Sequence, residues 1–549
     1  MILSTYNTDK TLCRFKENPT GRISFDYWEA CGKENAQLKS NTKGIEAIDL
    51  LFANYQPPAR DDEPPNRDKI LAQCLKNVSY LKDLDNQSEI YGIFPDNGPI
   101  LPLGSTEMSD HMQGMWIQHS GGSATSTDIK EAMNAAKGLV SANAEHVIEE
   151  PLRLRSGRYA GEEIQIALFT GENQNEVLRM NPQNGNWGIG HIGKDGVGYF
   201  KKSCAASALP RPIFGENCID DLWGFMNLNT EEDRVRVLAI ILLNLSGARM
   251  IPILSWIGGA GSAKTTQAVI VKQLTDPFEG SLEDPPVIKG TRLSEKALTI
   301  SASIMRNVIV DNASHADESM QDTYCGCVTG GKTAERLLYS NGGMYMSNYR
   351  VGLQTTSVTP ILTRPDVLDR AVVISCNRSE DFSIPERTRL KMWSEAYPRI
   401  FSSVITLLSR VVPVLGSIKL AGDLRMADYI IMGEAIWRDR GHTAGGFEES
   451  CREAIGNSIK KAGEGSAFIS WLVAKSKEST IPIFIKGTSP EIFEAEIAAL
   501  TRRRSEGMPK TSSGMDDLLV RYEQCLVVHG IGVNRAPDGV LTFTNKNLI

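Results

Sequence analysis

Residues 251–266 read IPILSWIGGAGSAKTT, an apolar strand followed by a glycine-rich turn and a Lys-Thr pair that opens a helix. Small residues let consecutive backbone N–H groups in such a turn point inward and bind phosphate oxygens. The lysine then reaches the β- and γ-phosphates of a nucleoside triphosphate, and the next hydroxyl holds Mg²⁺. The segment therefore predicts a P-loop, with ATP and Mg²⁺ as its ligands.

The residues expected to contact the nucleotide run from this turn into the helix. Ala263 stands where a glycine usually precedes the lysine, and we expect it to be tolerated with a negative φ, as the first turn of a helix requires. A glycine-rich turn that binds no phosphate is the alternative, and the apolar helix QAVIVKQL after the Lys-Thr pair counts against it. The full set is Gly258, Gly259, Gly261, Ser262, Ala263, Lys264, Thr265 and Thr266.

Bulk properties indicate a cytoplasmic protein without a membrane segment. The longest apolar run, VLAIILLNL at 237–245, is too short to span a bilayer, and the N-terminus has no signal-peptide pattern. The 10 cysteines are scattered, which favours reduced thiols over disulfides or metal ligands. A net charge of −7 argues against a protein that coats nucleic acid with its whole surface, but leaves room for a local basic channel.

The chain of 549 residues is long enough for about three or four domains. We expect an N-terminal α+β accessory region at 1–225, with a Pro-rich linker near 56–67 and a small antiparallel β unit from about 150 to 202. Strands alternating with helices around the P-loop predict an α/β three-layer domain with a parallel sheet at 226–415. Residues 416–549 are expected to be helical and to end in a winged-helix-like arrangement of helices and two short strands.

A second apolar strand, NVIVD, ends at Asp311, about 45 residues after the P-loop lysine. A carboxylate at this end of a strand beside the P-loop threonine can hold Mg²⁺ through water, so Thr265 and Asp311 form the expected metal site. The next residue is Asn312, which can orient the attacking water but cannot accept its proton at neutral pH. Glu318 is acidic and close in sequence, but is expected on the following helix, which leaves the general base unassigned.

The segment 329–358 predicts a hairpin, because two strand-like stretches flank Asn-Gly-Gly. Lys332 and Arg336 precede the turn and Arg350 follows it. Such a hairpin can project into a pore and bind a phosphate backbone. A surface hairpin with solvated basic residues is the alternative.

Two further polar positions follow the hairpin. Either Thr355 or Thr356 ends the strand VGLQTT, where a polar side chain contacts the γ-phosphate or the attacking water. Arg364 and Arg370 lie just before the strand AVVISC, where an arginine of a ring ATPase reaches the nucleotide of the neighbouring subunit. A salt bridge to an aspartate in the same loop is the other role open to either arginine.

Together these motifs resemble the superfamily 3 helicase-like AAA+ ATPases of phages, plasmids and integrated elements, to which the poxvirus-type primase-helicases are related. The resemblance runs through GGAGSAKTT, NVIVDNAS, TGGKTAERLLYSNGG and RPDVLDRAVVI and covers about residues 200–440. The chain departs from many members at Asn312, where they carry an acidic residue, and at Thr356, where they carry asparagine.

The resemblance implies an ATP hydrolase that assembles as a hexameric ring and translocates on single-stranded or forked DNA. It places Lys264 and Thr265 in the Walker A motif and Asp311 in the Walker B motif. Thr356 then takes the sensor-1 position, and Arg370 the arginine-finger position.

Many members of that family carry a primase upstream, which needs clustered carboxylates for two metals. Residues 1–225 offer only Asp83 and Asp85 as a DxD pair, with Asp96, Asp110 and His111 isolated. We therefore interpret this region as accessory.

The leading hypothesis is an ATP-dependent DNA helicase or translocase that acts in replication of a phage or other mobile element. An NTP-driven assembly switch, which binds nucleic acid or protein without unwinding, is the alternative favoured by Asn312 and the acidic net charge. A small-molecule kinase is a third possibility, which the basic hairpin and the following arginine disfavour.

Overall fold

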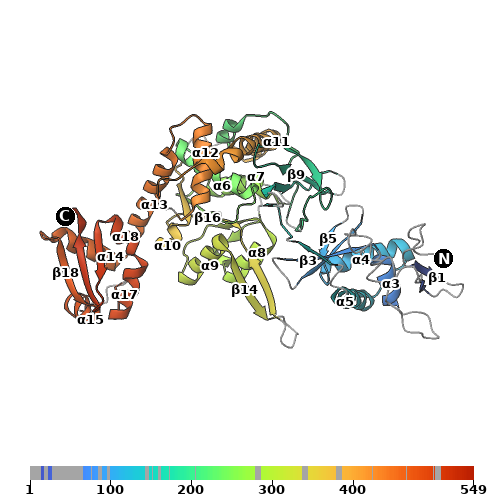
Figure 1. Ribbon diagram of the computed structural model, residues 1–549, viewed down its shortest axis with the longest axis horizontal. Coiled ribbons are helices and arrows are strands. Elements are labelled where there is room, and N and C mark those ends of the chain that lie inside the picture. Colours follow the sequence, from blue (N-terminus) through green and yellow to red (C-terminus); the bar gives the residue numbers. More distant parts are fainter. Residues whose placement is uncertain are drawn as a thin grey trace.

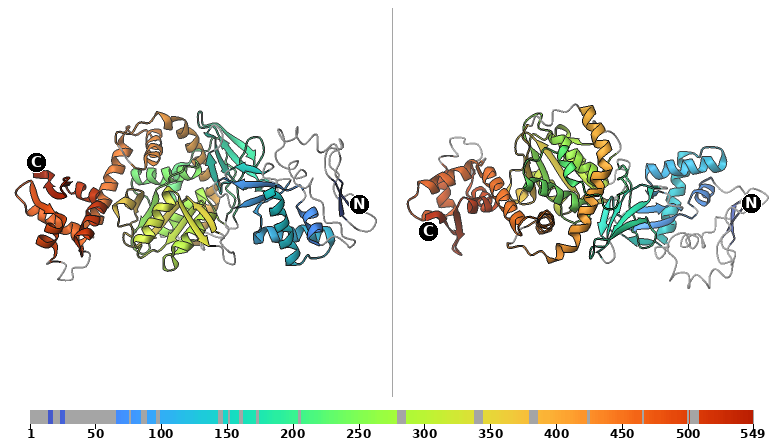
Figure 2. Two further views of the ribbon diagram at one scale, coloured as in Figure 1. Left: turned by 60° about the horizontal axis from the view of Figure 1, so that its bottom comes forward. Right: turned by 90° about the horizontal axis from the view of Figure 1, so that it is seen from above.

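The computed structural model is elongated, with the N-terminal part at one end, the P-loop part in the middle and the C-terminal part at the other end (Figures 1 and 2). It describes residues 14–17, 23–26, 66–336 and 344–548, apart from short gaps at 76, 85–88, 96–98, 143–146, 151, 159–161, 172–173, 204–205, 279–285, 379–385, 423–424, 465, 499 and 501–507. Most of the predicted linker at 56–67 lies outside these residues, as do Asp85 and Asp96.

The N-terminal part contains a short pair of strands, a four-stranded sheet and three helices that share one apolar core. The pair joins β1 (Arg14–Glu17) to β2 (Ile23–Asp26), and the sheet has the order β5-β4-β3-β6. Asp83 of β3 is buried and accepts a hydrogen bond from the backbone of Leu152 at 3.0 Å, so this carboxylate has a structural partner. The elements are β3 (Ser79–Asp83), β4 (Ile90–Ile93), β5 (Ile100–Pro102), β6 (Ile148–Glu150), α3 (Asn66–Cys74), α4 (Thr106–Ser120) and α5 (Ser126–Ala142).

A second four-stranded sheet confirms the small antiparallel β unit expected between about 150 and 202. Its order is β10-β9-β8-β7, with every neighbouring pair antiparallel. The strands are β7 (Ser156–Arg158), β8 (Ile164–Ala167), β9 (Glu176–Met180) and β10 (Trp187–His191).

The central part is built on a five-stranded sheet of order β12-β13-β16-β11-β17, in which every pairing is parallel. This sheet confirms the α/β prediction for the P-loop part. Apolar runs form these strands because helices leave little of a parallel sheet exposed to water. The strands are β11 (Ile253–Ile257), β12 (Ile288–Lys289), β13 (Asn307–Asp311), β16 (Gly352–Ser357) and β17 (Ala371–Ser375).

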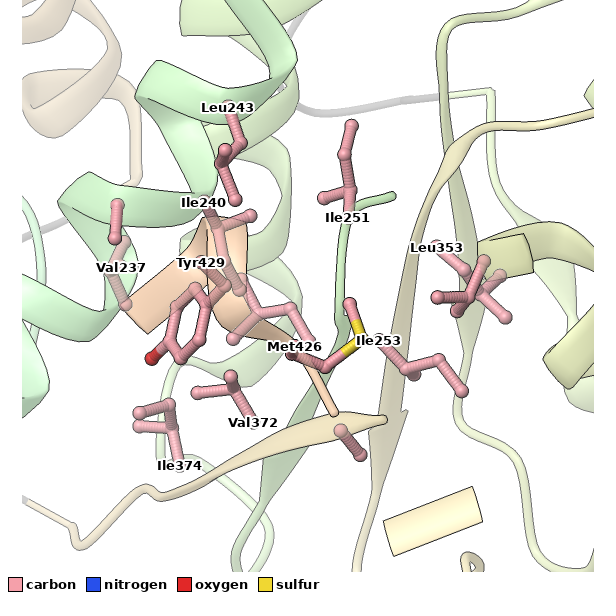
Figure 3. Packing of buried hydrophobic residues seen from close by; sticks show 14 of the residues in the cluster. Val237, Ile240, Leu243, Ile251, Ile253, Leu353, Val372, Ile374, Met426 and Tyr429 are labelled. Carbon is pink, nitrogen blue, oxygen red and sulfur yellow. The ribbon is translucent and has the colours of Figure 1, made fainter. Parts of the chain in front are cut away.

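Helices pack around this sheet and complete its core. An N-cap begins α6 (Glu231–Leu245), where the Thr230 hydroxyl accepts a hydrogen bond from the backbone of Asp233. Val237, Ile240 and Leu243 of this helix pack toward the sheet, beside Tyr429 (Figure 3). The other helices are α7 (Lys264–Thr275), α8 (Glu295–Ile304), α9 (Glu318–Thr329), α10 (Pro365–Leu368), α11 (Glu386–Val411) and α12 (Ala427–Asp439).

A buried polar chain fixes the register of the three middle strands. The Gln354 side chain of β16 donates to the Asn307 side chain of β13 at 3.0 Å and accepts from the Trp256 indole of β11 at 3.1 Å. It also donates to the carbonyl of Ala268 in α7 at 2.9 Å. Each hydrogen bond is worth more in such a buried setting than in water, and a register slip would break all of them.

A buried charge cluster joins the antiparallel β unit to the P-loop part. Arg155 is fully buried, and its guanidinium pairs with Asp276, just after α7, at 3.3 Å. Lys272 pairs with the same carboxylate at 3.2 Å and donates to the carbonyl of Asn307 at 2.6 Å. Burial alone would raise the pKa of Asp276, but Lys272 and Arg155 together hold it below its usual value.

The C-terminal part has one strand more than the sequence predicted. Its antiparallel sheet has the order β18-β20-β19, and β18 (Ile483–Thr488) is the strand that the sequence analysis missed. The strand is separated by helices from the other two, so no hairpin pattern marks it. The remaining elements are α13 (Gly446–Glu464), α14 (Ala467–Glu478), α15 (Ser489–Ile492), α17 (Ser512–Arg521), α18 (Glu523–Val528), β19 (Ile531–Arg535) and β20 (Val540–Asn545).

One helical stretch among the described residues, 387–417, is long and apolar enough to cross a membrane, but 56% of its most apolar window is buried inside the structure. Ile400, Phe401 and Val404 of this stretch belong to the core that also contains the parallel sheet. Its apolar face is therefore used in packing.

The charge cluster predicts that Arg155→Ala lowers the free energy of unfolding by about 3 kcal/mol or more, because the buried Asp276 loses one of its two cationic partners. The matched control is Arg158→Ala, which removes a part-exposed pair with Glu162 at 3.6 Å and should cost less than about 1 kcal/mol. Denaturant unfolding of both variants measures the difference. Equal unfolding midpoints would contradict the role given to the cluster.

Candidate nucleotide-binding site

The glycine-rich turn, residues 258–263, joins β11 to α7 at the carboxyl end of the parallel sheet. The Lys264 ammonium lies over this turn, donating to the carbonyls of Gly258 at 2.7 Å and Gly259 at 2.8 Å. A side chain at Gly258 would lie 2.2 Å from the carbonyl oxygen of Cys376, so the close approach to β17 requires glycine. The turn therefore presents a lysine and the start of α7 at one place, as anion binding requires.

Two other residues of the predicted set take local roles. The Ser262 hydroxyl is buried and donates to the carbonyl of Gly259 at 2.9 Å, which braces the turn. Thr266, in the first turn of α7, lines a small hollow together with Phe225 and Trp393. Thr266 lies beside the helix start, and its contact with a nucleotide stays a prediction.

The expectation for Ala263 is wrong, since its φ is +61° and its backbone is left-handed. The helix begins one residue later, so Ala263 is the cap before it and not part of its first turn. A left-handed backbone costs a residue with a Cβ atom about 1 kcal/mol or more. This conformation explains why glycine is usual at this position, and it makes alanine a strained replacement.

The carboxylate of Asp311 ends β13 beside the P-loop. Its Oδ1 accepts hydrogen bonds from the hydroxyl of Thr265 at 2.7 Å and from that of Thr356 at 2.8 Å. Its Oδ2 pairs with the ammonium of Lys289 at 2.9 Å. Burial acts to raise the pKa of Asp311, but these three donors outweigh it and keep the pKa below its usual value. The carboxylate is therefore held in its ionised form.

The structure distinguishes the two threonines that end β16. Thr355 hydrogen-bonds Ser255 of β11 at 3.1 Å within the sheet, whereas Thr356 reaches Asp311. Successive side chains of a strand point to opposite faces, so only one of them can face the site. Thr356 is the one that does.

The side-chain oxygen atoms of Thr265 and Asp311 suit a magnesium ion as ligands. Mg²⁺ prefers oxygen ligands and is commonly held by one or two protein groups together with substrate phosphates. Thr265 and Asp311 supply a hydroxyl and a carboxylate, while the described residues contain no group of three or more His, Cys, Asp or Glu side chains. The pair fits an ion that arrives with a nucleotide.

The conformation of Asn312 gives a physical reason why asparagine stands here in place of the acidic residue that many family members carry. Its φ is +53°, a left-handed backbone that asparagine adopts far more readily than glutamate. Its backbone N–H donates to the Thr356 hydroxyl at 2.8 Å, and its side chain is exposed. Glu318 begins α9, as expected, and pairs with Arg521.

The two candidate arginines have different partners. Arg364 pairs with Asp322 at 2.6 Å and with Asp366 at 2.8 Å, so it takes the structural role that was open to either. Arg370 donates to the backbone carbonyl of Asp366, and among the described residues no carboxylate pairs with it. Its charge is therefore not neutralised by a carboxylate in the part of the chain that the structure describes.

The predicted hairpin is present as β14 (Gly331–Arg336) paired antiparallel with β15 (Met344–Tyr349), and it projects from the body of the molecule (Figure 1). The side chains of Lys332 and Arg336 lie outside what the structure describes. Arg350 is exposed and donates to the carbonyl of Thr329 at 2.9 Å. A role of these three residues in DNA binding stays a prediction.

Lys289 is a residue of the site that could not be recognised in the sequence. It ends β12, a strand of only two residues whose apolar pattern is too short to recognise. The register of β12 and β13 places Lys289 directly opposite Asp311. No local pattern marks this lysine, since its place beside Asp311 is set by the strand register.

The backbone of Ala263 predicts that Ala263→Gly stabilises the protein by up to about 1 kcal/mol, because glycine adopts a positive φ without strain. The control is Ala454→Gly inside α13, where the same exchange should destabilise by about 1 kcal/mol. Denaturant unfolding of the two variants gives both signs. A loss of stability in both would contradict the strain assigned to Ala263.

Comparison with known proteins supports the motif interpretation over the central part of the chain. Residues 219–444 match the model of the replication proteins of actinomycete integrative conjugative elements. No curated protein matches the sequence. The matched residues contain the P-loop, Asp311, the hairpin and Arg370.

Solved structures add only distant likenesses. An apo structure of the NrS-1 C-terminal region is 8% identical, covers 87% of this chain and 98% of that chain, and has a TM-score of 0.36. A JCV helicase with a bound small molecule is 12% identical over 44% of this chain and 70% of that chain, with a TM-score of 0.20. At such scores neither likeness supports an argument, whereas the family match does. Residues 219–444 thus match the family of actinomycete integrative conjugative element replication proteins, which confirms the resemblance of this chain to replication proteins of mobile elements.

Proposed function

We propose that this protein is an ATP-dependent DNA helicase or translocase that acts in replication of a mobile element. The observation that carries the proposal is the hydrogen-bonded group of Thr265, Asp311 and Thr356, which brings the P-loop helix and two strands of a parallel sheet to one carboxylate. The family match to replication proteins supports the DNA substrate. ATP and Mg²⁺ are the proposed ligands.

In this proposal the P-loop turn and Lys264 bind the β- and γ-phosphates, and Thr265 and Asp311 hold Mg²⁺. The bound ion neutralises charge that develops on the phosphates. Thr356 orients the carboxylate of Asp311 through its hydroxyl. Asn312 orients the attacking water with an exposed amide, in place of a stronger base.

We also propose that the chain is organised in three parts. Residues 1–225 form an accessory region, 226–415 the AAA+ ATPase domain of three layers, and 416–549 a helical region with a winged-helix-like end. The order of the C-terminal sheet, β18-β20-β19, and the helices between its strands support that end. The projecting hairpin supports a DNA contact through Lys332, Arg336 or Arg350 (Figure 1).

The second candidate is a nucleotide-driven assembly switch that binds nucleic acid or protein without unwinding it. Asn312 favours this candidate, because its left-handed backbone disfavours the glutamate that would act as a strong base. Slow hydrolysis is sufficient for a switch but not for a motor. The two candidates share the nucleotide site and differ in turnover and strand displacement.

The P-loop assignment predicts that Lys264→Ala lowers ATP hydrolysis by about 100-fold or more, since the phosphates lose a positive charge placed at the turn. Lys391→Ala is the matched control, because that lysine is 78% exposed on α11 and should leave the rate unchanged. The assay measures phosphate release with and without single-stranded DNA, together with displacement of a labelled strand. Wild-type turnover in Lys264→Ala would remove the nucleotide site, whereas hydrolysis without strand displacement would favour the switch.

The contacts of Arg370 predict that it acts on the nucleotide of a neighbouring subunit in a ring, proposed to be a hexamer. Arg370→Ala should lower hydrolysis by about 1,000-fold, as loss of an arginine finger does. Mixing it with Lys264→Ala should restore activity, because roughly one interface in four then combines an intact P-loop with an intact arginine.

Two results would weigh against Arg370 acting in trans. Proven mixed oligomers without recovered activity would assign Arg370 a role within its own subunit. An Arg364→Ala variant that lost only hydrolysis and was restored by the same mixing would move the role to Arg364. The pairs of Arg364 with Asp322 and Asp366 predict a loss of stability for that variant instead.

A further inference from the structure

The ion pair of Lys289 and Asp311 lies at the same carboxylate that is proposed to hold Mg²⁺. The Lys289 ammonium is 2.9 Å from Oδ2 of Asp311, and the lysine side chain is 59% exposed while the aspartate is buried. Because the ammonium is exposed, water can solvate it when it leaves the carboxylate, which keeps the cost of separation small.

The position of Lys289 is fixed by close packing of two loops. A side chain at Gly290 would lie 2.5 Å from the carbonyl oxygen of Asn312, so the turn after β12 touches the turn after β13. The strand register then sets Lys289 beside Asp311. The pairing thus follows from the backbone and not from a chance side-chain orientation.

The three donors to Asp311 differ in how they tolerate a metal ion. Thr265 and Thr356 donate hydrogen bonds to Oδ1, and the oxygen of Thr265 keeps lone pairs with which to bind a cation. The Lys289 ammonium has no lone pair and carries a positive charge, so it repels a divalent ion at Oδ2. Among the described residues, Lys289 is the only cationic side chain paired with Asp311.

We propose that Lys289 is a built-in cation that competes with Mg²⁺ for Asp311 and is displaced when the ion arrives with its nucleotide. The inference rests on the proposed nucleotide site. It makes the affinity of the free protein for divalent ions low, so that the metal binds together with the nucleotide. Lys289 is then a positioning residue, which holds the ionised carboxylate in place until the ion replaces it.

Binding of Mn²⁺ to the full-length protein, followed by electron paramagnetic resonance of the free ion, tests this inference without measuring activity. In the absence of nucleotide, Lys289→Met should bind Mn²⁺ about fivefold more tightly than wild type, the effect of removing an exposed cation from a carboxylate. Lys289→Arg should stay within about twofold of wild type, because the charge is kept. Lys391→Met should not change the affinity, since that lysine is far from Asp311 in sequence and 78% exposed.

The same titrations with ADP present distinguish failure of the proposed competition by Lys289 from failure of the proposed nucleotide site. If ADP promotes Mn²⁺ binding but Lys289→Met and wild type have equal affinity without nucleotide, the competition is overturned and the nucleotide site stands. If neither protein binds Mn²⁺ with ADP, and Asp311→Asn behaves as wild type does, both are overturned. Thermal melting of Lys289→Met, and a second variant, Lys289→Gln, exclude misfolding as the cause of either result.

Discussion

The carboxylate of Asp311 is the group on which the rest of the proposed site depends. It accepts hydrogen bonds from the hydroxyls of Thr265 in the P-loop helix and Thr356 in β16, and it pairs with the ammonium of Lys289 in β12. Four neighbouring elements of one sheet edge therefore meet at a single ionised group. A displacement of any of them by one residue would break at least one contact of Asp311, so the fold and the proposed chemistry are specified together.

Buried polar groups elsewhere keep this edge in register. Gln354 links β13, β16 and β11 in the middle of the sheet, and Asp276 ties the end of α7 to the start of β13. The same aspartate binds Arg155 from the antiparallel β unit. The P-loop helix is thus held at both ends, by Asp311 near its start and by Asp276 just after its last turn.

Features with a local chemical signature could be predicted from the sequence. The strand ending at Asp311 and the P-loop helix starting at Lys264 both follow from apolar runs and their polar ends. Features set by contacts between distant segments could not. Lys289 meets Asp311 only through strand pairing, and the left-handed backbone of Ala263 depends on how the turn closes on the helix. The residues alone left Thr355 and Thr356 open; the family resemblance favoured Thr356, which is the one that reaches Asp311.

The most direct test of the central claim is calorimetric titration of the full-length protein with a slowly hydrolysed ATP analogue, with and without Mg²⁺. A P-loop joined to a metal-holding carboxylate predicts saturable binding of about one nucleotide per chain, strengthened by Mg²⁺. Asp311→Asn should lose the effect of Mg²⁺ and keep weak nucleotide binding. Absence of saturable binding, or binding that Mg²⁺ and Asp311→Asn both leave unchanged, would contradict the site described for this chain.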